Sequence, residues 1–550
     1  MKKKSNILFV NLPSIPLNDL EAMFDNSNLI SQSMSMPLGI MYLSSYIKKN
    51  AMVESIAITD YVRNLEYLLN YKNIEEYIQD TAQKSCDFTP DIIAISLLFS
   101  ASHSFFEKAY KSLKSIWPNA KVIVGGVHAT NAASKLLDWY DIDYVIRGEA
   151  EISFASLIQA LPLNKKIKIA GVYTRSNIKE ASPLLLSPFI DDLDTIPFPD
   201  WDLIDMDFYT EARGRVRDTG KNQLHASLFT TRGCPFKCTF CSAHTVHGRN
   251  LRFRSVENII EEMQVLNQKY GVSLFNPEDD LFTAKKSRLL QLLEKIKVLE
   301  IPDLEIQLPA GLSVNTLDED IIDELIQAGV KIAVLAIESG SEHVQKNIIK
   351  KNCDLKKAKG LVKYLKLNKL TVRCYFILGF PGEIQKNLQE TVDFAKSLKA
   401  DWCVFNIATP LVGSEMYDEL VQLGCIDDSI HTWTNTVFDR RAFDTKEIKA
   451  DQLNDFLYRA NLDCNFIHNP NMTEGNYLKA IDIFKDVTLN HPFHIIAWYC
   501  IMGCLLKTDN QEEADQIKSK IKSLIKSDKR AKDMWEKYND LMPDLIIYEE

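Results

Sequence analysis

Residues 230–245, TTRGCPFKCTFCSAHT, decide the fold, because Cys234, Cys238 and Cys241 share this one short loop. Three residues separate the first two cysteines and two residues separate the last two. This spacing lets three thiolates converge on one compact cluster of four irons and leaves one iron without a protein ligand. The loop therefore predicts an iron–sulfur centre with an open corner where a small molecule binds.

Two other uses of these cysteines are open from the spacing alone. A structural zinc ion takes four ligands, and His244 or His247 lies close enough in sequence to supply the fourth. A disulfide with a spare thiol is the second alternative. The chain has eleven cysteines, and its start, MKKKSNILFVNLPS, lacks the long apolar run of a secretory signal. Reduced thiols and a cytoplasmic protein are therefore expected, and the iron interpretation is favoured.

The run CPFKCTFC resembles the cluster motif of the radical S-adenosylmethionine (SAM) superfamily. The resemblance implies a [4Fe-4S] cluster held by Cys234, Cys238 and Cys241, with the amino and carboxylate groups of SAM on the open iron. It further implies that the reduced cluster cleaves SAM to methionine and a deoxyadenosyl radical.

From about residue 225 to 425, short apolar runs alternate with longer amphipathic ones, which is typical of strand and helix units around a parallel sheet. Six such units fit an incomplete barrel rather than one of eight. Radical SAM domains have such a partial barrel, with the cluster loop after the first strand. The expected strands are ASLFTT, SLFN, LEIQLP, KIAVLAI, TVRCYFILG and WCVFNIA.

An acidic segment, NPEDDLFT, follows the second expected strand. Ligands gather at such strand ends in barrels of parallel strands. The segment resembles the family's DD-x-F-T variant of the motif that holds the SAM amino group, which points to Asp279 and Asp280 more than to Glu278. A loop that only caps the next helix is the alternative.

Three further segments resemble SAM-contacting parts of the family. PAGLSVNTLDED has Ser313 where an arginine often stands, so the chain departs from the family at a charge contact with the SAM carboxylate. AIESGS resembles a segment at the ribose or sulfonium end of SAM, and GFPGE forms a turn that a flat base can approach closely. A buried glutamate paired with a barrel neighbour is the alternative for AIESGS. The contacts expected in the barrel are Phe240, Asp279, Asp280, Ser313, Glu338, Ser339, Gly379 and Pro381.

The first 160 residues predict a separate, doubly wound α/β domain. Short apolar runs such as NILFVNLP and KVIVGG alternate with amphipathic helices such as SFFEKAYKSLKSIW. Loops after the strands line a ligand crevice in such folds, and paired glycines let the backbone approach a bulky cofactor. The candidate ligand contacts are Ser96, Gly125, Gly126, His128, Thr130, Gly148 and Glu149.

Together, PLGIMYLSSY, GGVHAT and RGEAE resemble the cobalamin-binding domain that is fused to radical SAM barrels. The DxHxxG motif that supplies an axial imidazole in some cobalamin proteins is absent, since LPSIPLND follows the first strand. His128 follows a different strand and is interpreted as a loop histidine rather than a cobalt ligand. The resemblance implies cobalamin without a protein histidine on cobalt.

The expected organisation is a cobalamin-binding domain at 1–160, a proline- and aspartate-rich linker at 161–220, a radical SAM partial barrel at 221–430 and a helical region at 431–550. The last region contains a hairpin like a tetratricopeptide unit. With 550 residues and 46% hydrophobic content, the chain can bury two or three cores. Its net charge of -10 argues against nucleic-acid binding, and no apolar run is long enough for a membrane span.

The resulting hypothesis is a cobalamin-dependent radical SAM methylase that acts on an unactivated carbon of a small molecule or lipid. In that cycle one SAM methylates reduced cobalt and a second yields the radical that activates the substrate. An electron donor such as flavodoxin or ferredoxin is expected as a partner. A non-methylating cyclase or rearrangement enzyme is the first alternative, and a cobalamin-binding sensor or scaffold is the second. The substrate does not follow from the sequence.

Overall fold

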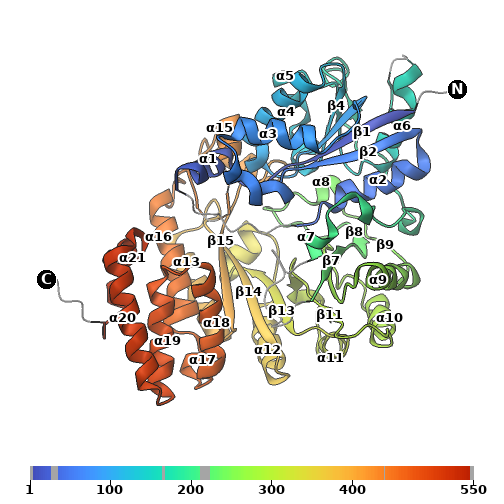
Figure 1. Cartoon of the computed structure of the whole chain (residues 1–550). Helices are drawn as coiled ribbons and strands as arrows, with labels where there is room; N and C mark the ends of the chain where they lie inside the picture. Colours follow the sequence, from blue (N-terminus) through green and yellow to red (C-terminus); the bar gives the residue numbers. More distant parts are fainter. Residues whose placement is uncertain are drawn as a thin grey trace.

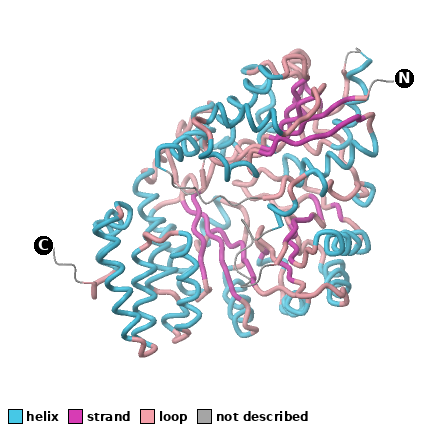
Figure 2. The backbone as a smooth tube through the Cα atoms, viewed as in Figure 1, coloured by secondary structure: helices cyan, strands magenta, loops and turns pink. Residues whose placement is uncertain are grey.

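The computed structural model describes residues 4–26, 35–163, 167–181, 183–210, 223–435, 437–438 and 440–545. An N-terminal α/β layer lies above a barrel-like set of parallel strands, and C-terminal helices stack at the side of that barrel (Figure 1). In Figure 2, loops lie between the strands of the N-terminal sheet and the strands of the barrel. The predicted α/β class with a helical C-terminal region is confirmed.

The N-terminal sheet has the strand order β2-β1-β3-β4-β5-β6, parallel except for β6. Strand β1 (Ser5–Asn11), between β2 and β3, is buried on both faces, which explains the unbroken apolar run ILFV. The other strands are β2 (Val53–Asp60), β3 (Ile92–Ser96), β4 (Lys121–Gly125), β5 (Tyr144–Ile146) and β6 (Val172–Tyr173). The order reverses between β1 and β3, and ligands bind at the carboxyl ends of strands at such a point.

Helices cover both faces of this sheet. They are α1 (Leu17–Asn26), α2 (Leu38–Asn50), α3 (Ile74–Lys84), α4 (His103–Ile116), α5 (Val127–Trp139) and α6 (Glu151–Ala160). Strand β6 lies past residue 160, inside the stretch that the sequence assigns to a linker, and the short helix α7 (Met206–Thr210) follows. The residue boundaries of the domains stay a prediction.

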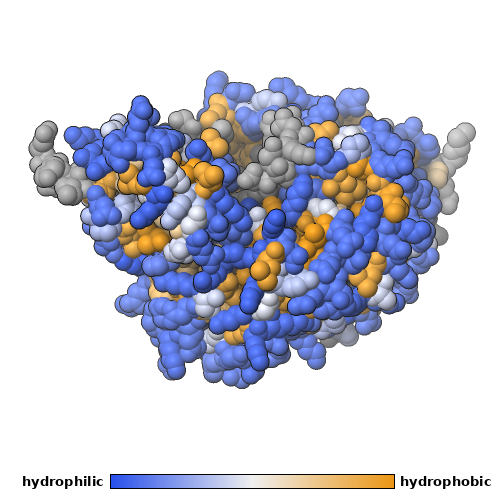
Figure 3. Space-filling model, turned by 90° about the horizontal axis from the view of Figure 1, so that it is seen from below, coloured by the Kyte–Doolittle hydropathy of each residue, from blue (hydrophilic) through white to orange (hydrophobic). Residues whose placement is uncertain are grey.

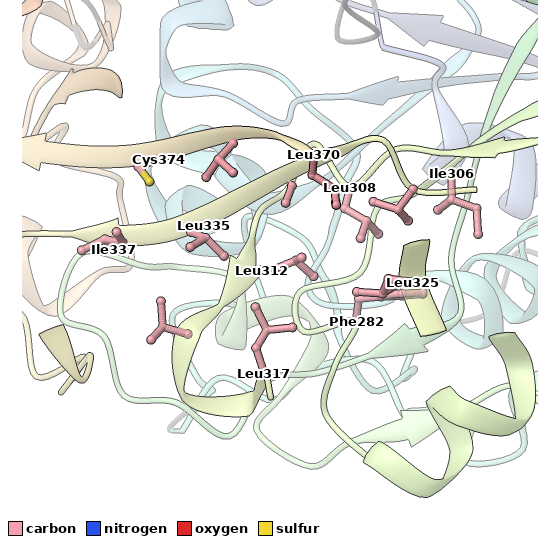
Figure 4. Close-up of a cluster of buried hydrophobic side chains, with 14 of the residues drawn as sticks. Phe282, Ile306, Leu308, Leu312, Leu317, Leu325, Leu335, Ile337, Leu370 and Cys374 are labelled. Atoms are coloured by element: carbon pink, nitrogen blue, oxygen red, sulfur yellow. The ribbon is translucent and has the colours of Figure 1, made fainter. Parts of the chain in front are cut away.

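All six strands expected in the barrel region are present. They are β7 (His225–Leu228), β10 (Leu274–Pro277), β11 (Glu305–Ile306), β13 (Ile332–Glu338), β14 (Thr371–Leu378) and β15 (Trp402–Ile407). They form two parallel sheets, β11-β10-β7 and β12-β13-β14-β15, with β12 at Leu312–Ser313. An isolated parallel bridge between Ile306 and Val330 joins them. Side chains such as Ile306, Leu335 and Cys374 fill the interior (Figure 4).

Helices follow the barrel strands as the apolar periodicity predicts. They are α8 (His244–His247), α9 (Val256–Tyr270), α10 (Lys286–Lys297), α11 (Glu319–Gln327), α12 (Leu355–Leu367), α13 (Gln385–Leu398), α14 (Glu415–Gln422) and α15 (Ile430–Thr434). The cluster loop lies between β8 (Thr231–Arg232) and α8, and β9 (Arg252–Phe253) pairs antiparallel with β8. This hairpin holds the base of the loop.

The C-terminal helices form their own apolar core against the barrel. They are α16 (Ala450–Leu462), α17 (Pro470–Thr473), α18 (Tyr477–Asn490), α19 (Ile495–Lys507), α20 (Gln511–Ser527) and α21 (Lys529–Tyr538). Asn465, buried beside α16, bonds the backbone N–H and carbonyl of Cys403 at 2.7 and 2.6 Å. Since β15 is the last strand of its sheet, this side chain covers an otherwise open edge.

Apolar side chains are interspersed with hydrophilic ones on the face seen from below (Figure 3). Exposed apolar residues of the C-terminal helices include Leu478 and Leu489, which are 74% and 79% exposed. None of the helices in the described ranges has the length and apolar character needed to cross a membrane.

Candidate functional site

The three predicted cluster cysteines lie together in one half-buried loop. Burial raises the pKa of Cys238 to about 11, and the nearby thiols of Cys241 and Cys234 add to that rise, so the three sulfurs are neighbours. At Gly233, where φ is +94°, a Cβ atom would clash with the carbonyl oxygen of Asn250. The glycine before the first cysteine is therefore required by the loop itself.

The described residues form no ready-made site for a single zinc ion. Zinc ligands lie about 2.3 Å or less from the ion and hence close to each other. No group of three His, Cys, Asp or Glu side chains in the described part of the chain is close enough to hold a single metal ion. His247, the alternative fourth ligand, has its Nδ1 atom 2.8 Å from Glu149, which leaves Nε2 as the nitrogen that a metal would meet. Three neighbouring thiols from one loop fit a [4Fe-4S] cluster, which stays the favoured interpretation.

The acidic loop after β10 divides its carboxylates between two environments. Asp279 is buried and accepts hydrogen bonds from the backbone N–H groups of Thr230 and Thr231 at 2.6 and 3.1 Å. Burial raises the pKa of Asp279 to about 6, although these bonds oppose the rise. Asp280 is exposed; burial is the main cause of the raised pKa of Cys234 and of Cys241, and the nearby charge of Asp280 adds to the rise of each. Asp280 is thus the better placed of the two for a SAM ammonium group.

Lys351 is a residue that the sequence analysis missed. Its ammonium group is buried and lies 2.7 Å from Glu338 Oε1. Burial would lower the pKa of Lys351, but the charge of Glu338 raises it above its ordinary value, and the Cys238 thiol acts in the same direction. A cation therefore lies beside the cluster loop. No motif signals this residue, because the pairing depends on how the segment after β13 turns back.

The other expected SAM contacts lie at the carboxyl ends of the barrel strands, several of them in internal bonds. Ser339 is fully buried and bonds Thr391, while Ser313 is 9% exposed. Phe240 packs on Phe380 with ring centroids 5.7 Å apart. The residues whose SAM contacts stay a prediction are Phe240, Asp279, Asp280, Ser313, Glu338, Ser339, Gly379 and Pro381.

Glu383, the last residue of GFPGE, stabilises this turn. The Glu383 carboxylate accepts the N–H groups of Gly379 and Phe380 at 2.7 and 3.0 Å. Burial raises the pKa of Glu383 to about 7. Arg441, from the segment that follows the barrel, donates to the carbonyl of Gly379 at 3.2 Å. These bonds fix the backbone of the turn.

The carboxyl edge of the N-terminal sheet fits a large, flat and partly apolar cofactor. Ser96 ends β3 and is followed by Leu98 and Phe99, whose side chains are 42% and 38% exposed. Gly126 has φ +109°, and a Cβ atom there would approach the Leu97 carbonyl oxygen to 2.6 Å. Gly126 therefore lets the chain after β4 pass close to the end of β3. A corrin ring at this edge would cover the exposed apolar side chains of Leu98 and Phe99.

Two predicted cobalamin contacts lie inside the domain. His128 is 2% exposed, its Nδ1 atom is 3.0 Å from Ser100 Oγ, and its ring centroid is 4.7 Å from that of Trp433. Burial lowers the pKa of His128 to about 3. Thr130 is also buried and accepts the N–H of Gly148 at 3.0 Å. His128 lies in the first turn of α5, so the expectation of a loop histidine is wrong about its place, while its role toward cobalt stays a prediction. The cobalamin contacts of Ser96, Gly125, Gly126, His128, Thr130 and Gly148 stay a prediction, as does that of Glu149, whose carboxylate is bonded to side chains of the barrel domain.

Glu149 binds the barrel domain. Its carboxylate accepts hydrogen bonds from Arg232 at 3.0 Å, from Arg252 at 2.8 Å and from His247 at 2.8 Å. Burial would raise the pKa of Glu149, but these bonds hold it far below its ordinary value. Helix α8, near the cluster loop, is visible directly beneath the N-terminal sheet in Figure 1. The two candidate cofactor sites are thus joined by charged side chains.

A cavity of about 250 Å³ opens beside the carboxyl end of β15. Thr409, His431 and Arg441 are among the residues that line it. The sequence analysis did not anticipate this cavity, because its walls come from β15 and from the segment after the barrel.

Comparisons with known proteins agree with this geometry. The family model described as the radical SAM superfamily matches residues 228–395, and the model of the B12 binding domain matches residues 31–158. A solved structure of the cobalamin-dependent S-adenosylmethionine radical enzyme OxsB, with aqua-cobalamin and S-adenosylmethionine bound, aligns with a TM-score of 0.63 and 14% identity. The alignment covers 100% of this chain and 82% of that one, which supports the fold alone.

Curated relatives include methyltransferases and a cyclase. An uncharacterized methyltransferase of Pyrococcus horikoshii is 29% identical over 84% of this chain and 91% of its own length. Cytidylyl-2-hydroxyethylphosphonate methyltransferase of Streptomyces wedmorensis is 28% identical over 71% and 79%. An anaerobic magnesium-protoporphyrin IX monomethyl ester cyclase of Cereibacter sphaeroides is 24% identical over 76% and 66%.

Fold, cysteine loop and family model together identify residues 228–395 as a domain of the radical SAM superfamily. More particularly, a B12 binding domain precedes it at residues 31–158, so the chain combines the two domains that the sequence predicts.

Proposed function

We propose that this enzyme methylates an unactivated carbon of a small molecule. The observation that carries the proposal is the direct bonding between the cobalamin-binding domain and the cluster loop. Besides the contacts of Glu149, Asn131 on α5 donates to Thr245 Oγ1 on α8 at 2.9 Å. Methyl transfer that needs both cofactors requires their sites to be adjacent. The methyltransferases among the relatives support this function.

Each part of the site has a role in this proposal. When bound, the cluster with SAM supplies radical chemistry and cobalamin supplies methyl transfer. Cys234, Cys238 and Cys241 hold the cluster, and the exposed carboxylate of Asp280 accepts hydrogen bonds from the SAM ammonium group. Lys351 supplies the cation for the SAM carboxylate, in place of the arginine that this chain lacks at Ser313. The exposed apolar side chains after β3 cover one face of cobalamin and exclude water.

The substrate class is a small molecule or a lipid, and the electron donor is a flavodoxin or a ferredoxin. A cytoplasmic location is supported by the eleven cysteines, none of which forms a disulfide. Nucleic acid is not proposed as a partner, because the net charge of -10 opposes binding to phosphates.

A second candidate function is cyclisation or rearrangement without net methyl transfer. The cyclase among the relatives is the observation that favours it. The two functions differ in the mass of the product, because only a methylase adds one methylene unit.

The test is anaerobic incubation of the reconstituted full-length enzyme with SAM that carries a labelled methyl group, in extract of the native host. A labelled metabolite heavier by one methylene unit, formed together with deoxyadenosine, supports methylation. Deoxyadenosine with an unlabelled new product supports the second function. A protein that takes up zinc instead of iron, or forms neither deoxyadenosine nor methionine, refutes both.

A further inference from the structure

One carboxylate of the cobalamin-binding domain contacts three cationic side chains of the barrel. Glu149 follows β5 and is 5% exposed. Within the described residues, four hydrogen bonds reach it from side chains: one from Arg232, two from Arg252 and one from His247. All three donors come from the other domain. The Glu149 carboxylate therefore connects the two domains.

The three donors enclose the cluster loop. Arg232 precedes Cys234 by two positions, so it lies where the chain enters the loop. His247 ends helix α8, where the chain leaves the loop, and Arg252 follows on β9. In the β8–β9 hairpin, Arg232 and Arg252 are directly paired. One carboxylate thus holds both the entry and the exit of the loop that carries the cysteines.

The Glu149 carboxylate offsets the repulsion between the two arginines of the β8–β9 hairpin. Like charges directly opposite each other on paired strands are destabilising. Arg232 and Arg252 are 7% and 8% exposed, so water screens their repulsion poorly. Glu151 pairs with Arg232 at 2.8 Å and offsets part of this charge. Glu149 contacts both guanidinium groups, and so it is the group that holds the two strands together at this point.

The same carboxylate is adjacent to the edge where the cobalamin-binding strands end. Gly148, the preceding residue, donates its N–H to Thr130 on α5. Arg147 donates to the carbonyl of Thr130 at 2.7 Å. Helix α5 starts at the glycine pair after β4. The two residues before Glu149 thus tie it to the cobalamin side, and its carboxylate ties it to the cluster side.

We propose that Glu149 is a positioning residue that sets the separation between the cluster site and the cobalamin site. This inference rests on the proposed function, since it requires both cofactors. A buried ion-pair network is weak evidence for stability, and its best-attested use is to specify one arrangement. A network that bridges two cofactor sites suits this use, because misplacement by about 1 Å can cost roughly 100-fold in rate.

The test compares two variants of the full-length protein reconstituted with cluster and cobalamin. Glu149→Gln removes the charge between the domains. Glu305→Gln is the matched control, because Glu305 is fully buried and pairs with Lys331 within the barrel domain. The readout is the spin–spin interaction between cob(II)alamin and the reduced cluster by electron paramagnetic resonance, which depends on their separation. Iron, cobalamin and the free energy of unfolding are measured alongside.

We expect Glu149→Gln to keep both cofactors but to show a changed and more widely distributed spin–spin coupling. Glu305→Gln should keep the wild-type coupling at a similar loss of stability. An unchanged interaction in Glu149→Gln overturns the inference. If that variant does not fold, Arg252→Lys serves instead, because it keeps the charge but loses the two-pronged contact, and the same two results decide. Wild-type protein that binds no cobalamin or no iron refutes the proposed function itself, which is a different failure.

Discussion

Asp279 and Asp280 are neighbours in sequence, yet we expect different effects when each is changed to asparagine. Asp280→Asn should weaken SAM binding, and Asp279→Asn should lower the free energy of unfolding. In the proposed site, Asp280 accepts a charged hydrogen bond from SAM, and Asp279 holds the loop after β7. A hydrogen bond to a charged group contributes about 1.5–3 kcal/mol. Because about 1.4 kcal/mol corresponds to a tenfold change in affinity, Asp280→Asn should weaken SAM binding by roughly 10- to 150-fold. Its stability should be unchanged, since Asp280 is exposed.

Asp279→Asn is the matched control. The two backbone donors at 2.6 and 3.1 Å and the Thr230 hydroxyl all point at the carboxylate. An amide turns an NH₂ group toward one of these donors and leaves it unsatisfied, which costs about 1–3 kcal/mol of unfolding free energy. SAM binding is measured by anaerobic equilibrium dialysis and stability by urea unfolding. SAM affinity within twofold of wild type in Asp280→Asn, with weak binding and normal stability in Asp279→Asn, would refute this assignment.

Three further predictions concern stability and the cobalamin site. Trp433→Ala should lower the free energy of unfolding in urea by about 3–5 kcal/mol, because the fully buried indole packs on His128; a loss under 1 kcal/mol would contradict this. Gly126→Ala should cost roughly 2 kcal/mol from the positive φ and the close Leu97 carbonyl, whereas Gly125→Ala, with 3.9 Å to its nearest neighbour, should cost less; equal losses would argue against it. The pKa of His128 is about 3 in the folded protein and about 6.5 in the unfolded chain. The contribution of His128 to the free energy of unfolding is therefore present above pH 6.5 and falls by about 2 kcal/mol between pH 6.5 and 5. His128→Gln should therefore show a shallower acid decline in urea unfolding at a series of pH values, and an unchanged slope would exclude this cause.

The sequence anticipated the parts of the site that are local. The spacing of the cysteines, the six barrel strands and the carboxyl-end loops follow from residues close together in the chain. The partners of acidic residues did not follow. Glu149, expected at the cofactor, bonds residues about 100 positions away, and Lys351 was not anticipated at all.

The sequence by itself determined the features that depend on residues close together in the chain. These are the three-cysteine loop, the alternation of strands and helices, and the glycine pair at the end of β4. These depend on spacing and on backbone conformation, which neighbouring residues fix. Only the tertiary structure decided which carboxylates face a ligand and which face the protein. The reason is that a side chain's partner is set by strands and domains brought together in folding, and Asp279 and Asp280 have the same chemistry until that packing separates them.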